Sequence, residues 1–166
     1  HDKSLDQAIL KKYDIDHLSR KTRDRDDYWF KVFNVKMVPV VSYRAQPKFL
    51  SDWGFGSDHL KEKYPLTPWE VDKGHHGTHV CFEVKGNSMD DGSKSAFIDG
   101  DSILCCEIKK EHWKKYFSMP NKDYVIVHRE NGVHLKRIGS YDIGKQQVTL
   151  QSLNKSFFLQ NITVYK

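Results

Sequence analysis

Short runs of β-branched and aromatic residues recur along this chain, and several of them alternate with polar residues. Runs of this kind are typical of strands with one buried face. They cover residues 37–43, 78–84, 124–129, 133–138, 146–152 and 162–165. The third and fourth runs are separated by Glu130-Asn131-Gly132, and Asn-Gly is a strong hairpin signal. The pattern therefore predicts a mainly β domain built from short strands and hairpins.

Helical spacing is confined to three short stretches. Residues 4–13 space their apolar side chains as a short amphipathic helix, with Ser4 at the N-cap position. A helical turn is predicted over residues 58–64. Trp113 and Phe117 stand four positions apart, the spacing of a short helix with one apolar edge.

The composition changes between the first predicted helix and the first predicted strand. Residues 17–27 mix charges of both signs without periodicity, which is typical of a solvated linker. We therefore expect an N-terminal helix and charged linker over residues 1–36 and one folded domain over residues 37–166. The chain begins with His1 rather than Met, so we expect further residues upstream.

Composition narrows the class of protein. The 166 residues are 38% hydrophobic, enough for a real core, and the net charge of +5 favours approach to polyanions. The three cysteines are an odd number: Cys81 lies in the run over residues 78–84, and Cys105 and Cys106 lie in a further strand-like run over residues 103–108. This placement indicates buried thiols in a reducing compartment. No apolar run is long enough to span a bilayer, and no signal peptide is seen. We therefore expect a cytoplasmic protein without membrane contact.

The polar stretch Gly86-Asn87-Ser88-Met89 follows the strand predicted over residues 78–84. Gly86 permits backbone angles that other residues resist, so the N–H groups of Ser88 and Met89 can face a substrate carbonyl. This placement suits a nucleophilic serine. The alternative is an ordinary polar loop, since Gly, Asn, Asp and Ser are the usual turn residues.

A lysine in the second strand of the predicted hairpin supplies a matching base. In residues 133–138, alternation places His134, Lys136 and Ile138 on one face. A lysine among apolar neighbours loses hydration, and its pKa falls. As a neutral amine it can then accept a proton from a serine hydroxyl. The sequence therefore predicts Ser88 and Lys136 as a catalytic pair within hydrogen-bonding reach.

Three motifs in order, Gly86-Asn87-Ser88-Met89, Gly100-Asp101 and Val133-His134-Leu135-Lys136-Arg137, resemble those of the LexA-like self-cleaving repressors and their UmuD-like relatives. The resemblance covers roughly residues 37–166 and is nearer to repressor-like members from phages. It implies a compact, partly open β barrel in which Ser88 is the nucleophile and Lys136 the general base. It also implies an oxyanion hole made by the backbone of Ser88 and Met89, with no cofactor.

The resemblance also implies partners. A regulatory domain of this family forms homodimers, which we expect through residues 151–165, and it cuts its own linker as a peptide substrate. Operator DNA is read by an upstream domain that this chain does not contain. Two alternatives remain open: a catalytically silent dimerisation and sensing module of a phage-type repressor, and a UmuD-like polymerase accessory subunit.

The family's cleavage region falls on Ala45, Gln46, Pro47 and Lys48. The family's scissile bond is typically Ala-Gly, and here Pro47-Lys48 stands in its place. Proline fixes φ and lacks an N–H, while lysine adds a side chain where glycine has none. We therefore predict that the Pro47–Lys48 bond is cleaved poorly or not at all, with Ala45–Gln46 as a shifted site.

A histidine-rich segment raises the question of a metal. His75, His76 and His79 lie near Cys81, but this spacing matches no familiar zinc pattern and no second ligand pair follows. We predict no metal site.

Overall fold

The computed structural model describes residues 34–71, 74, 77–119, 121–158 and 160–163. The predicted helix over residues 4–13 and the charged linker lie outside the described residues. The chain divides into two compact units, one of residues 1–36 and 70–73, and one of residues 37–69 and 74–166. In the described part of the first unit, the Val71 N–H donates to the Asn34 carbonyl at 3.1 Å, and the Asn34 side-chain amide donates to the Val71 carbonyl.

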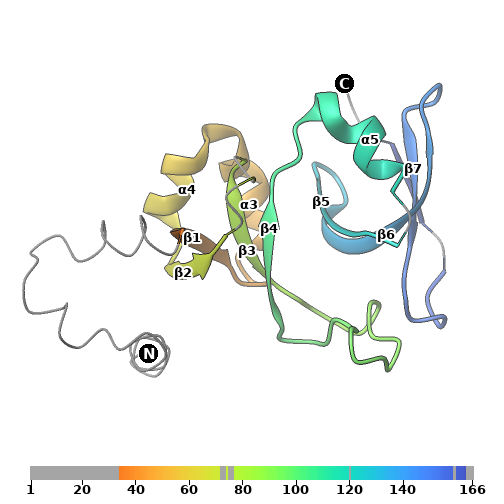
Figure 1. The fold of residues 1–166 in the computed structure, drawn as a ribbon, viewed down its shortest axis with the longest axis horizontal. Coiled ribbons are helices and arrows are strands. Elements are labelled where there is room, and N and C mark those ends of the chain that lie inside the picture. Colours follow the sequence, from red (N-terminus) through yellow and green to blue (C-terminus); the bar gives the residue numbers. More distant parts are fainter. Residues whose placement is uncertain (1–33, 72–73, 75–76, 120, 159, 164–166) are drawn as a thin grey trace, which may run out of the picture. The chain divides into compact units, whose positions relative to one another are not determined.

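One four-stranded sheet contains the strand that precedes Ser88, the predicted nucleophile. Its strands are β1 (Val35–Val41), β2 (Leu66–Glu70), β3 (His79–Glu83) and β4 (Ser102–Cys106), in the order β2-β1-β3-β4. Strand β1 runs parallel to β3, and β4 runs antiparallel to β3. The connection from β3 to β4 leaves the sheet at the end of β3 and returns at the start of β4 (Figure 1).

The second sheet is an antiparallel meander. Its strands are β5 (Asp123–His128), β6 (Gly132–Asp142), β7 (Gln147–Gln151) and β8 (Gln160–Thr163). Gly132 has a φ of +87°, which explains why the hairpin turn before β6 requires glycine. The register between β6 and β7 shifts between Ile138 and Ser140, and β6 curves in Figure 1.

Three short α-helices are found in the described residues: α3 (Gln46–Asp52), α4 (Ser57–Lys63) and α5 (Trp113–Phe117). The 3₁₀ turns η1 (Trp53–Phe55) and η2 (Lys110–His112) precede α4 and α5. The helical turn predicted over residues 58–64 corresponds to α4, and the helical spacing of Trp113 and Phe117 corresponds to α5. Helix α3 was not predicted, although Pro47 stands in its first turn, where proline is tolerated.

The two sheets share a hydrophobic core. Its buried members come from the first sheet and the helices, and the partly buried side chains of Val125, Val127 and Val133 from the second sheet pack against them. Phe49 of α3 is fully buried at the centre of this core, with ring centroids 5.9 Å from Tyr64 and 5.2 Å from Phe82, both edge to face. Burial of Phe49 thus fixes α3 against both sheets.

A second cluster lies on the other face of the β5–β6 hairpin. Ile138, Val148 and Leu150 are buried there, and α5 contributes Phe117. The prediction of a mainly β domain is confirmed, and within the described residues the strands form two sheets without a closed barrel. None of the described helices is long and apolar enough to cross a membrane.

Candidate active site

Two backbone hydrogen bonds join the start of the β3–β4 connection to its end. The Val84 N–H donates to the Asp101 carbonyl at 2.8 Å, and the Gly100 N–H donates to the Val84 carbonyl at 2.9 Å. Gly100 has a φ of +91°, a conformation that favours glycine. The Gly100-Asp101 motif therefore closes the base of the loop that carries Ser88.

A carboxylate holds the backbone just before Ser88. Gly86 adopts a φ of +81°, and its N–H donates to Asp99 Oδ1 at 2.6 Å. This hydrogen bond lowers the pKa of Asp99, with a smaller contribution from Lys85. Asp99 therefore stays ionised near neutral pH and fixes the turn that presents Ser88.

Lys136 lies in β6 on an apolar face. It pairs across the hairpin with Tyr124, and His134 on the same face pairs with Ile126. Ile126 and Tyr124 pack on the second hydrophobic cluster. Burial among these neighbours lowers the pKa of Lys136, as the alternation in the sequence predicted.

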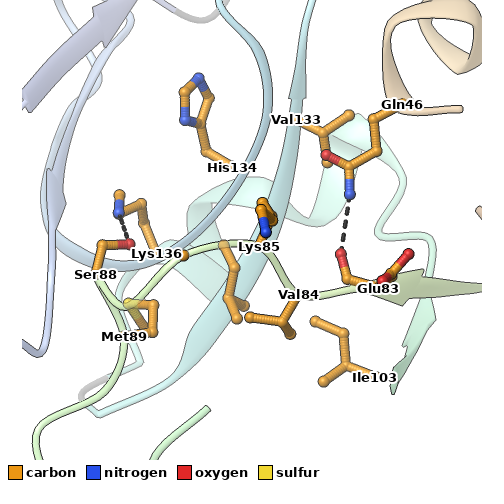
Figure 2. A pocket seen from close by; sticks show the side chains of 12 residues that line it. Gln46, Glu83, Val84, Lys85, Ser88, Met89, Ile103, Val133, His134 and Lys136 are labelled. Atoms are coloured by element: carbon orange, nitrogen blue, oxygen red, sulfur yellow. Dashed lines mark hydrogen bonds between the residues drawn. The ribbon is translucent and has the colours of Figure 1, made fainter. Parts of the chain in front are cut away.

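Figure 2 shows the meeting of the two predicted residues. Lys136 Nζ donates to Ser88 Oγ at 2.5 Å, so the prediction that the two side chains lie within hydrogen-bonding reach is confirmed. Both residues line the same pocket. A neutral amine at this position can accept the hydroxyl proton, because the two atoms are already in contact.

The lowered pKa of Lys136 leads to a measurable expectation. When ¹³C-methyl groups are added to the lysine amines by reductive methylation, the Lys136 signal should titrate below the ordinary pH range of a lysine side chain, because burial lowers its pKa. Desolvation disfavours the ammonium form, so the neutral amine gains population as the pH rises through this lowered pKa. Titration of Lys136 within the ordinary range of a lysine side chain would contradict the burial argument.

The backbone around Ser88 offers donors for a developing oxyanion. Met89 is buried, and its carbonyl accepts a hydrogen bond from the Phe97 N–H at 3.2 Å, which anchors the loop. The Asp90 N–H donates to the Asn87 carbonyl. Neither the Ser88 N–H nor the Met89 N–H donates to an acceptor within the residues that the structure describes. An oxyanion hole made by these two N–H groups requires that they have no such acceptor.

His134 joins the site although the sequence had not marked it. It lines the pocket with Ser88 and Lys136 (Figure 2). Its Nε2 lies 2.5 Å from the Asn131 carbonyl oxygen. Burial lowers the pKa of His134 most strongly, the hydrogen bond to Asn131 raises it, and the Lys136 charge lowers it. Its two-residue spacing from Lys136 on one strand was the signal that could have identified it.

The structure places the predicted cleavage region in helix α3. Ala45 is the N-cap residue, and Gln46 turns its side chain into the pocket, where Nε2 donates to the Glu83 carbonyl at 3.0 Å (Figure 2). Pro47 and Lys48 are exposed on the helix and do not line the pocket. Only Gln46 of the four residues is therefore brought to Ser88 and Lys136.

The question of a metal is partly answered by the described residues. His75 and His76 lie outside them, while His79 and Cys81 stand in β3. No group of three or more His, Cys, Asp or Glu side chains suited to a metal ion is found in the part of the chain that the structure describes.

Comparisons with known proteins give no relative of this chain: no family model, no curated protein and no solved structure matches it. Its function must therefore be inferred from the contact between Ser88 and Lys136, the backbone around them and the three motifs that carry these residues.

Proposed function

We propose that residues 37–166 are the regulatory, peptidase-like domain of a LexA-like transcriptional repressor, with Ser88 and Lys136 as a Ser-Lys dyad. The observation that carries this proposal is the hydrogen bond between Lys136 Nζ and Ser88 Oγ in a shared pocket. Two sheets that share one core, with the dyad between β3 and β6, are compatible with the partly open barrel of that family.

The proposed reaction is acyl transfer. Neutral Lys136 takes the hydroxyl proton as Ser88 Oγ attacks a peptide carbonyl carbon, and the N–H groups of Ser88 and Met89 stabilise the oxyanion. The Lys136 ammonium then gives its proton to the departing amine. A water molecule, deprotonated by Lys136, releases the acyl group from Ser88.

The proposed substrate is a peptide segment of the protein's own linker, and the proposed assembly is a homodimer that binds operator DNA through an upstream domain. Self-cleavage by a tethered segment is independent of protein concentration, because the reaction is intramolecular. The net charge of +5 supports the DNA-bound role by favouring approach to a polyanion.

A specific observation favours a second candidate, a catalytically silent dimerisation and sensing module. Pro47 and Lys48 lie in helix α3, and the adjacent Phe49 is fully buried. A peptide bond inside a helix cannot present its carbonyl to a nucleophile as an extended segment can, and extracting α3 would expose Phe49. In a silent module, the contact between Ser88 and Lys136 is retained, but the Pro47–Lys48 bond is not cut.

Self-cleavage separates the two candidates. In the unaltered protein at neutral and alkaline pH, we expect no fragment ending at Pro47. The Pro47–Lys48 bond lies inside helix α3, and proline and lysine stand where the family has alanine and glycine. Fragments are mapped by mass spectrometry. The Pro47→Ala/Lys48→Gly variant should be cut at this bond, faster at alkaline pH, where Lys136 is more often neutral.

A control variant and two possible outcomes decide how that experiment is interpreted. Adding Ser88→Ala to the double substitution should abolish cutting, which ties the reaction to the dyad. A double variant that stays intact while keeping its fold would favour the silent module, whereas efficient Ser88-dependent cutting of the unaltered Pro47–Lys48 bond would refute the cleavage prediction.

A further inference from the structure

Two exposed phenylalanines stand beside the candidate nucleophile. The exposed fractions of Phe157 and Phe158 are 44% and 94%. Together with Ser88 and Lys136 they line an open cleft of about 310 Å³. This volume lies at the lower end of the range of about 300–1,000 Å³ that is usual for ligand sites. Exposed aromatic rings in such a cleft indicate a binding surface.

The two rings give this cleft its apolar character. The other residues that line it are polar, charged or glycine: Lys85, Gly86, Asn87, Ser88, His134, Lys136 and Ser152. Among the described residues that line the cleft, Phe157 and Phe158 are thus the only large apolar side chains. An apolar group of a peptide held at Ser88 has no other large apolar surface to cover in this cleft.

The turn that carries the rings is fastened to the nucleophile. The Asn154 N–H donates to the Ser88 carbonyl at 3.1 Å, and Asn154 Nδ2 donates to the Asn87 carbonyl at 3.0 Å. The turn is closed internally, because the Ser156 N–H donates to Asn154 Oδ1 and the Phe157 N–H donates to the Asn154 carbonyl. The backbone of Phe157 is therefore connected to that of Ser88 through the hydrogen bonds of Asn154.

Resting on the proposed function, we propose that Phe157 and Phe158 form an apolar subsite of the Ser88 cleft, and that this subsite receives a leucine, methionine or phenylalanine side chain of the bound peptide that does not itself flank the bond that Ser88 attacks. A peptide explains the surface better than a second copy of the chain does. Two aromatic side chains present about 150–250 Å² each, whereas a stable interface buries about 800 Å² per partner.

The test measures binding without turnover. The full chain with Ser88→Ala is titrated, with NMR detection, with four acetylated and amidated hexapeptides of alanine and serine. These differ only in a central Gly, Ala, Leu or Phe. We expect the Leu and Phe peptides to bind about tenfold more tightly than the Gly peptide, since they gain contact with an apolar wall. The ring signals of Phe157 and Phe158 should shift with the Leu peptide.

Substitution of the two phenylalanines then tests whether they cause the preference for the Leu peptide over the Gly peptide. Phe157→Ser/Phe158→Ser, added to Ser88→Ala, should reduce the difference between Leu and Gly peptides to less than twofold. The matched control is Phe55→Ser, which alters a phenylalanine that is 72% exposed and outside the cleft. An unchanged preference in the double variant, or no measurable preference in the parent, would overturn the subsite.

The outcomes separate this subsite from the proposed function. Selective binding of the Leu peptide with no Ser88-dependent cutting of any peptide would support the subsite and count against the peptidase. Ser88-dependent cutting with equal binding of all four peptides would support the peptidase and reject the subsite. If sedimentation shows a dimer that Phe158→Ser dissociates, while peptide preference is unaffected, the rings belong to a self-association surface and the subsite is rejected.

Discussion

Replacing Lys136 by alanine is expected to lower the rate of Ser88-dependent cutting by about 10²–10⁴-fold, the usual contribution of a positioned general base. The rate is measured on the Pro47→Ala/Lys48→Gly protein by the loss of intact chain over time. Lys136→Arg should not rescue the reaction, because a guanidinium keeps its proton at any pH at which the protein is folded. The expectation follows from the contact between Nζ and Oγ.

A matched substitution separates loss of the base from loss of a positive charge. Lys145 also lies in the second unit, but its side chain is 77% exposed, pairs with Asp142 and lines neither of the two pockets. Lys145→Ala should leave the rate unchanged. A Lys136→Ala protein that cuts as fast as Lys145→Ala would remove Lys136 from the mechanism.

The Lys136→Met variant, which keeps the length of the side chain, tests whether loss of activity results from loss of stability. The pKa of Lys136 is lower in the folded than in the unfolded protein, so the unfolded state binds more protons between these two values. Burial of this lysine therefore costs stability below the folded pKa, and the cost disappears as the pH rises through the unfolded pKa. Lys136→Met should be at least as stable as the parent at neutral pH although it is inactive.

Replacing Phe49 by alanine is expected to lower the free energy of unfolding by about 3–5 kcal/mol. The side chain is fully buried, and its ring lies between those of Trp53, Tyr64 and Phe82, with centroids 5.3, 5.9 and 5.2 Å away. Removing it leaves a cavity at the point where α3 meets both sheets. Urea denaturation followed by circular dichroism gives the difference.

Phe55 provides the comparison for that experiment. It is the same residue type, only six positions along the chain, but 72% of its surface is exposed and its ring contacts only His59 among the described aromatic side chains. Phe55→Ala should change the free energy of unfolding by about 0.5 kcal/mol or less. Equal losses for Phe49→Ala and Phe55→Ala would show that Phe49 does not organise the core.

The parts of the fold that the sequence predicted are those with local signals. The β5–β6 hairpin was read from alternation and from Asn-Gly, and β3 and β7 from their β-branched runs. Strand β2 and helix α3 were missed. Residues 66–70 contain a proline and lack alternation, and α3 is held by Phe49 in the shared core rather than by a cap, since Ala45 makes no side-chain cap.

The same distinction applies to the candidate site. Ser88 and Lys136 could be paired from motifs and from the face that Lys136 occupies in β6. Gln46 was predicted only as part of the cleavage region, whereas its side chain reaches the site through a hydrogen bond to the carbonyl of Glu83. Asn154 and Phe158 were not predicted as site residues, because they reach the site through tertiary folding, Asn154 by hydrogen bonds to the carbonyls of Asn87 and Ser88. Sequence spacing does not encode contacts of this kind.

Covalent labelling tests the pairing of Ser88 with Lys136 most directly. The unaltered protein is incubated with a fluorophosphonate, which forms a bond from a nucleophilic serine oxygen to phosphorus and releases fluoride, and the adduct is mapped by mass spectrometry. We predict a single modified residue, Ser88, labelled faster as the pH rises and not detectably labelled in Lys136→Ala. Labelling of other serines at the same rate as Ser88, or labelling of Ser88 that is unaffected by Lys136→Ala, would contradict the dyad.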